Sequence, residues 1–123
     1  MATRRFIVDV TTASDGSATA YSPYLSGEIV QISYIKTDFA DGVDFTITGE
    51  AIGQTLWAES NVNAAKNCFP REAIHSTAGV AALYAAGGTS VNDRIALSRD
   101  RVKIVIAQGG NTKTGQFQIV VKD

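Results

Sequence analysis

The chain has 123 residues, of which 45% are hydrophobic and 19% charged, and its formal net charge is −1. These values predict one compact domain with a real apolar core, and they exclude a disordered tail. The near-balance of charge gives no general attraction to nucleic acid or to an anionic membrane. No run reaches the roughly 18 apolar residues of a membrane helix, and the first residues lack a secretory signal, so we expect a protein that is soluble when made.

Alternation of apolar and polar residues, the pattern of half-buried strands, begins within the first ten residues. There the predicted inward side chains are Phe6, Val8 and Val10. Asp15-Gly16 predicts a tight turn, because glycine tolerates positive φ. Residues 28–36 predict a longer strand with Val30, Ile32 and Tyr34 on one face, and with Ile29, Gln31, Ser33 and Ile35 on the other.

The cleanest alternation lies in DFADGVDFTITGE, residues 38–50. Asp41-Gly42 predicts a turn, and a strand follows it. Its predicted inward side chains are Val43, Phe45 and Ile47, while its acidic side chains face out. A short strand with the only tryptophan, Trp57, is expected next.

Residues 59–78 show no convincing period and contain Asn61, Asn63, Asn67 and Pro70, so we predict an irregular segment there. A long segment without strands is unusual in a compact domain and often contacts a partner. GVAALYAAGG, residues 79–88, fits a buried strand or a short helix, and the flanking glycines favour the strand.

The last third predicts three strand segments. The first contains Val91, Ile95 and Leu97, and the second contains Val102, Ile104 and Ile106. In the third, the predicted inward side chains are Phe117, Ile119 and Val121. The last two segments flank GGNTKTG and are expected to form a hairpin. Together the pattern predicts an all-β fold in one domain spanning 1–123, an antiparallel β-sandwich or jelly-roll-like barrel of about eight short strands.

The acidic window 38–50 is a candidate metal or catalytic site. The spacing of Asp41 and Asp44 does not match an EF-hand loop, and strands rather than helices flank it. Asp44 and Glu50 are about 20 Å apart on an extended strand, too far for a carboxylate pair. Asp38 and Asp41 remain candidates for a loose cation site. The favoured interpretation is that Asp41-Gly42 forms a turn and that Asp44 and Glu50 face solvent on the strand that follows.

Other residues offer little chemistry. One histidine, His75, and one cysteine, Cys68, are too few for a structural zinc site, and the single cysteine excludes an internal disulfide. A Cys68–His75 nucleophile pair has no supporting motif, and Cys68 is expected to pack as a small apolar residue. No phosphate-binding loop or serine-nucleophile motif is present, so we predict no enzyme, no metal and no cofactor.

Basic residues recur in SRDRVKIV, where an extended backbone would put Arg99, Arg101 and Lys103 on one face. Such a stripe fits an acidic partner, and a solvated strand face is the alternative. No aromatic residues are interleaved with it, so we expect no specific nucleic-acid binding.

Three stretches, GEIVQISYIKTDFADGVDFTITGEA, LWAESNVNA and HSTAGVAALYAAGGTSVNDRIALSRDRVKIVIAQGG, resemble small virion structural proteins of tailed bacteriophages. The resemblance spans most of residues 5–121 and contains no catalytic motif. It implies a β-sandwich or jelly-roll subunit, usually a homo-oligomer with a trimer favoured, that decorates or reinforces a capsid. The expected partner is the major capsid protein, and the expected location is the capsid surface of a virion made in the host cytoplasm.

For this role we expect contacts from an N-terminal arm at residues 1–5, from the irregular segment 59–78 and from the basic stripe. The predicted interface residues are Arg4, Arg5, Trp57, Phe69, Arg99, Arg101 and Lys103. Trp57 fits a sandwich core equally well. The alternatives are a neck, tail or baseplate component, and a carbohydrate-binding β-sandwich, for which one tryptophan and four tyrosines supply few aromatic platforms.

Overall fold

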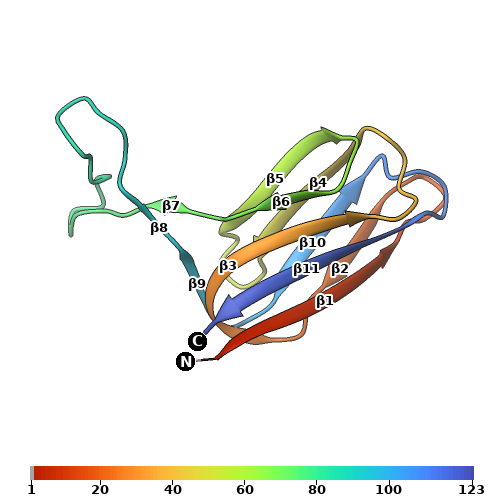
Figure 1. The fold of residues 1–123 in the computed structure, drawn as a ribbon, viewed down its shortest axis with the longest axis horizontal. Helices are drawn as coiled ribbons and strands as arrows, with labels where there is room; N and C mark the ends of the chain where they lie inside the picture. The colour runs from red at the N-terminus through yellow and green to blue at the C-terminus, as the bar shows by residue number, and fades with distance from the viewer. Residues whose placement is uncertain (1) are drawn as a thin grey trace.

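The computed structural model describes residues 2–123, which form eleven strands (Figure 1) and contain no helix that could cross a membrane. The strands are β1 (Thr3–Thr11), β2 (Ala18–Tyr21), β3 (Leu25–Lys36), β4 (Val43–Gly49), β5 (Thr55–Val62), β6 (Lys66–Cys68), β7 (Glu72–Ala73), β8 (Asn92–Asp93), β9 (Ile95–Asp100), β10 (Val102–Ala107) and β11 (Thr114–Lys122). β6, β7 and β8 have only two or three residues each, which leaves eight longer strands. The predicted all-β fold is confirmed.

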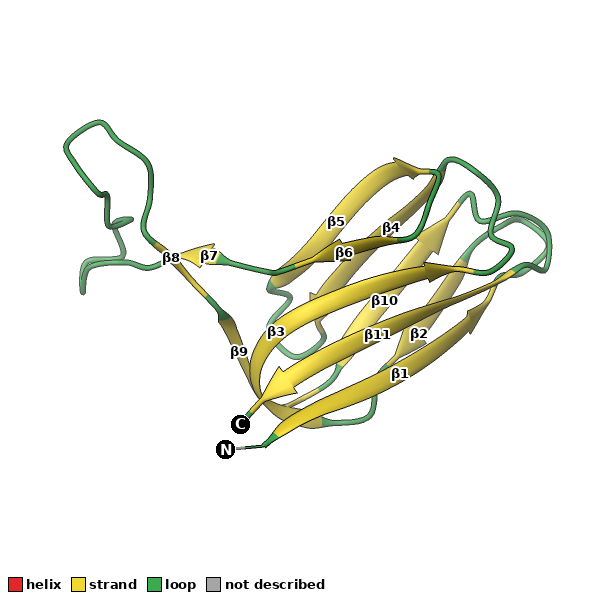
Figure 2. Cartoon of the chain, viewed as in Figure 1, coloured by secondary structure: helices red, strands yellow, loops and turns green. Residues whose placement is uncertain are grey.

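Two antiparallel sheets enclose one hydrophobic core. Sheet A has the order β1-β11-β3, and both β6 and β9 pair with the remaining edge of β3. Sheet B has the order β2-β10-β4-β5. A third, two-stranded sheet of β7 and β8 lies outside this sandwich, in the projection at the left of Figure 2.

Alternation predicts the core well in β1, β4, β10 and β11, because each of these strands has one face on the core and the other on solvent. The buried apolar side chains of these four strands are Val8, Val10, Val43, Phe45, Ile47, Val102, Ile104, Ile106, Phe117, Ile119 and Val121. Trp57 joins them: its indole is 7% exposed and meets the ring of Phe45 edge-on at 4.8 Å. Aromatic pairs of this geometry add to the stabilisation from buried area.

One local irregularity in β3 was not predicted. Val120 and Val121 of β11 pair with Gln31 and Ile29, so β3 bulges at Val30. The bulge shifts the alternation by one residue, since Ile29 is fully buried and Val30 is only half-buried. The predicted face of Val30, Ile32 and Tyr34 is therefore correct for the last two and wrong for the first.

The hairpin predicted from the last two strands is also wrong. β10 pairs with β2 and β4 in sheet B, whereas β11 pairs with β1 and β3 in sheet A. The chain crosses from one sheet to the other at residues 101 and 108–113, so strands that follow each other in sequence lie in different layers.

The predicted N-terminal arm is not a free segment over the residues that the structure describes. Met1 lies outside the described part, and Thr3, Arg4 and Arg5 are paired with Lys122, Val121 and Val120 in β1 and β11. The backbone amide of Ala2 donates to a carboxylate oxygen of Asp123 at 2.8 Å, so the two ends of the chain meet. An arm does exist, but it lies in the middle of the sequence.

Candidate functional site

The candidate site is an insertion in one edge strand of sheet A. Cys68 at the end of β6 pairs with Ile32 of β3, and Ile95 at the start of β9 pairs with Ile29 of the same strand. The edge of β3 is thus covered by one strand in two pieces, with 26 residues between them. Figure 1 shows these residues projecting away from the sandwich. We call residues 71–94 the arm.

The arm is organised by a three-way backbone junction. The amide of Ile74 donates to the carbonyl of Val91, that of Val91 to the carbonyl of Ala82, and that of Ala82 to the carbonyl of Ile74, each at 2.9 Å. Below the junction, β7 and β8 form a short stem. Above it are two turns, one closed by Ser76 and Val80 at 2.8 Å and one by Tyr84 and Thr89 at 3.0 Å.

This topology corrects two predictions. GVAALYAAGG does not form a buried strand, because it supplies the second half of one turn and the first half of the other. The irregular segment predicted at 59–78 is also misplaced: β5 continues to Val62, and β6 occupies Lys66–Cys68 before the arm begins. Alanine and glycine fit both a tight strand and a tight turn, so composition alone did not separate them.

No residue of the arm is buried. Among residues 2–123, eleven large apolar side chains are exposed, and five of them lie at or beside the arm: Phe69, Ile74, Val80, Leu83 and Tyr84. Tyr84 is 75% exposed and Val80 is 64% exposed. Exposed single hydrophobic residues are ordinary, but such a concentration on a projection marks an interaction surface.

Beyond its base, the arm is also uncharged. Residues 73–92 contain no lysine, arginine, aspartate or glutamate, the longest such run in the sequence. Exposed strands are commonly protected from association by charged side chains, and the centres of protein interfaces are depleted of charge. The charged residues of the arm lie at its base, where Glu72 accepts from Gln54 at 3.4 Å and Arg94 pairs with Glu28 at 3.5 Å.

The seven residues predicted to form an interface do not form one surface. Arg4 and Arg99 do come together, in a groove that Phe6, Tyr24 and Asp123 also line. Arg4 pairs there with Asp123 at 3.7 Å. Arg5 is exposed on the neighbouring part of β1, and Phe69 is exposed at the base of the arm.

The basic stripe is not continuous, because residues 99–103 do not form one strand. Arg99 has a φ of 48° in β9, whereas Lys103 lies on β10 in the other sheet. Arg101 sits between the two strands. Its guanidinium stacks on Tyr21, 3.9 Å from the ring centroid, and donates two 2.8 Å bonds to Glu50. This hydrogen-bonded pairing lowers the pKa of Glu50. We infer that Arg101 stabilises the chain at the point where it passes from sheet A to sheet B.

The carboxylates of the window 38–50 each have a protein partner. Asp38 accepts from the backbone and side chain of Thr114, which lowers its pKa, and Asp41 pairs with Lys36. Asp44 accepts from the amide of Asn61 at 2.8 Å. Gly42 has a φ of 86°, which confirms the predicted turn. Among residues 2–123 no three His, Cys, Asp or Glu side chains gather as a metal site would require.

Cys68 and His75 lie on different elements. Cys68 is half-buried in β6, and His75 is exposed in the arm, where its backbone bridges Ala81. Burial, with a smaller contribution from the charge of Glu59, raises the pKa of the Cys68 thiol. A raised pKa disfavours the thiolate, the form needed by a nucleophile.

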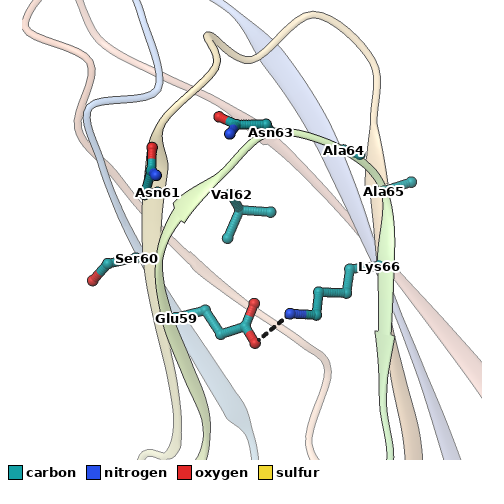
Figure 3. Close-up of a pocket in the computed structure, with 8 residues that line it drawn as sticks. All are labelled: Glu59, Ser60, Asn61, Val62, Asn63, Ala64, Ala65 and Lys66. Carbon is teal, nitrogen blue, oxygen red and sulfur yellow. Dashed lines mark hydrogen bonds and ion pairs between the residues drawn. The ribbon is translucent and has the colours of Figure 1, made fainter.

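An open hollow lies between β5 and β6 (Figure 3). It is bounded by the connection of residues 61–65, and an ion pair of 2.7 Å between Glu59 and Lys66 joins the two strands. Val62 is its one large apolar side chain, and Val62 belongs to the core. The hollow therefore presents short polar side chains and backbone, with no base and nucleophile placed together.

Sequence reasoning missed the residues that make the arm distinctive, Ile74, Val80, Leu83 and Tyr84. The available signal was the 20-residue run without charge at 73–92, whose length exceeds that of ordinary strands. A buried strand of that composition would need core on both faces, which one sandwich of this size does not offer to a further strand.

Comparison with known proteins adds little to this picture. No protein-family model matches the chain, and no curated protein matches its sequence. A solved structure described as the crystal structure of FLHE aligns over 100% of both chains, with 8% identity and a TM-score of 0.46. A likeness at this level supports no conclusion about function.

Proposed function

We propose that this protein is a non-enzymatic structural subunit of a tailed-phage virion, a capsid decoration (cement) subunit that binds and stabilises the major capsid shell at the capsid surface. The observation that carries the proposal is the arm, which has no buried residue and no charge between residues 73 and 92. The sequence resemblance supplies the class of assembly.

The physical basis is that the arm has an ordered backbone without a core of its own. Fixing a residue costs about 1–2 kcal/mol of backbone entropy, and a two-stranded hairpin alone is at best marginally stable. Four large apolar side chains of the arm are left in water: Ile74, Val80, Leu83 and Tyr84. Burial of each against a partner would contribute about 1.5–3 kcal/mol, so the arm gains most of its stability on assembly.

A decoration subunit needs area and not a deep pocket. The sandwich supplies a rigid body whose core is complete without the arm, since the buried apolar residues all lie outside residues 71–94. The groove of Arg4, Arg99 and Tyr24 is a second surface of suitable character, with two guanidinium groups beside an aromatic ring. Arginine and tyrosine are enriched at binding hot spots.

The test is co-sedimentation of the purified protein with assembled capsids that lack it, followed by heating of the decorated and undecorated shells. We expect saturable binding and a higher disruption temperature for decorated capsids. Val80→Asp should reduce binding, and Ile52→Asp should not, because Ile52 is 78% exposed but lies on the turn between β4 and β5. Absence of binding at about 10 μM would refute a decoration role, since such complexes are expected to be tighter.

The runner-up, a neck, tail or baseplate component, is separated by fractionating virions. Mass spectrometry of isolated heads and tails should find the protein in heads. Its recovery only with tails would overturn the capsid assignment while leaving the arm as an assembly surface.

A further inference from the structure

We infer that the arm packs on the outer face of sheet A of a second copy of this chain, so that copies join arm to face. The inference rests on the proposed role of the arm as an assembly surface, and it names a second copy of the chain as the arm's partner. The groove of Arg4, Arg99 and Tyr24 is then the surface left for the capsid shell, and Val80→Asp reduces capsid binding because it breaks up the multivalent oligomer. Three observations carry it: the size of the arm, the charge of the two surfaces and the direction in which the arm projects.

The arm is large enough to contribute much of an interface. It has 24 residues, none of them buried, and a standard protein interface uses about 20–30 residues on each side. The side of the arm that faces another copy therefore supplies a large share of an interface of the usual size.

The outer face of sheet A matches the arm in charge. Its centre is made by the outward residues of β11 and β3, which lie opposite each other in register: Gln116 with Ile35, Gln118 with Ser33, and Val120 with Gln31. None of the six is charged, and Ile7 of β1, 53% exposed, lies beside Gln118. Arg5 and Asp9 flank Ile7 on the edge strand β1, and Asp9 accepts from the side chain of Gln116 at 2.9 Å. An apolar arm laid along β11 and β3 covers the uncharged centre and leaves these two charges at its rim, so it avoids burying an unpaired charge, which would cost several kcal/mol.

The polar groups of this face are already paired within it. Gln118 donates to the side-chain oxygen of Gln116 at 2.8 Å, and Gln31 donates to the hydroxyl of Ser33 at 3.3 Å. Covering them therefore leaves fewer unsatisfied donors than covering isolated amides would. The outer face of sheet B is less suitable, because Lys103 stands in it between Tyr21 and Thr48.

The contact must be between different copies, since the arm projects away from its own sandwich (Figure 1). Each copy then offers one arm and one face, which are different surfaces. A contact of this kind is heterologous, and it covers every arm and every face only when the copies close into a ring. The expected assembly is thus a closed homo-oligomer.

Self-association is tested first, by sedimentation velocity over a concentration series with the full chain. Wild type should form a closed oligomer, Val80→Asp should weaken its association at least tenfold, and Ile52→Asp should leave it unchanged. Matching far-UV circular dichroism spectra and matching Trp57 fluorescence of the two variants would show that the sandwich is intact in both. A wild type that stays monomeric at about 1 mM, or a Val80→Asp chain that associates like wild type, would overturn the inference.

The receiving face is tested by mixed crosslinking. Ala86→Cys in the arm and Ser33→Cys on β3 are placed in separate chains, each carrying Cys68→Ala, and a short bis-maleimide is added. A crosslinked pair should form from the mixture and not from either chain alone. Products of Ala86→Cys with itself, or no product from an oligomeric mixture, would refute the arm-to-face contact.

These outcomes are separable from the proposed function. A chain that is monomeric and still binds capsids through the arm refutes the inference and keeps the decoration role. A chain that forms the ring and binds no capsid does the reverse.

Discussion

Consider a variant in which the arm, residues 71–94, is replaced by a flexible linker of about four residues. β3 advances only three residues between the partners of Cys68 and Ile95, about 10 Å, which Phe69, Pro70 and such a linker span. Shortening this connection from 26 residues to about six favours the folded state by about 1 kcal/mol through loop closure. The removed side chains are unburied, and the exposed contacts at the base contribute little. The free energy of unfolding should therefore rise by about 1 kcal/mol.

The assay is urea unfolding at a protein concentration at which the full chain is monomeric, because association through the arm would itself stabilise the folded state. Unfolding is followed by the fluorescence of Trp57, which lies in the core against Phe45. The m-value, which scales with the surface exposed on unfolding, should stay close to that of the wild type, since the arm is exposed in both states. A 24-residue Gly/Ser replacement of the arm is the matched control and should unfold like the full chain. A shortened variant that loses about 1 kcal/mol or more, or unfolds with a clearly smaller m-value, would show that the arm is part of the cooperative core.

Three further predictions concern the sandwich. The buried hydroxyl of Tyr34 has no hydrogen-bond partner among the described residues, so Tyr34→Phe should raise stability by about 1 kcal/mol in urea unfolding. Burial also raises the pKa of Tyr34 to about 12, so between pH 10 and 12 the folded state keeps a proton that the unfolded chain releases. The free energy of unfolding of the wild type should therefore fall in this pH range relative to that of Tyr34→Phe. Parallel stability curves of the two proteins would contradict this expectation. Gly115→Ala would bring a methyl group within 2.5 Å of the Phe39 ring and should cost about 1–3 kcal/mol in thermal unfolding, an unchanged melting temperature being the contrary result. Because Arg101 lowers the pKa of Glu50, the wild type should lose stability as the pH falls through that lowered value. The stability of Glu50→Gln should depend less steeply on pH in the acid range. Identical acid unfolding transitions would show that the ion pair does not contribute to stability.

The sequence predicts the buried residues correctly in strands that have one face on the core and the other face on solvent. Val43, Phe45 and Ile47 are buried as predicted, because each polar neighbour between them points outward. The sequence does not predict burial correctly where the alternation along one strand depends on its pairing with another strand. The bulge at Val30 follows from the register with β11, and the crossing at Arg101 follows from packing between layers, and neither leaves a local mark in the alternation.

The candidate site was only partly predictable for a similar reason. The segment around 59–78 was expected to contact partners, and its second half does enter the arm. The sequence predicts Arg4 and Arg99 as separate interface residues, and only the fold brings them into one groove. The three-way junction at Ile74, Ala82 and Val91 is made by backbone groups, for which side-chain patterns carry no information.

The divided edge strand, β6 and β9 on one side of β3, has a consequence for how such a protein can change over evolution. Cys68 and Ile95 each pair with β3, so we expect mutations between residues 71 and 94 to cost little folding stability. Changes in the length and sequence of the arm would then be limited mainly by its partners. The same two positions mark where a foreign peptide could be displayed on this scaffold with the least disturbance of its core.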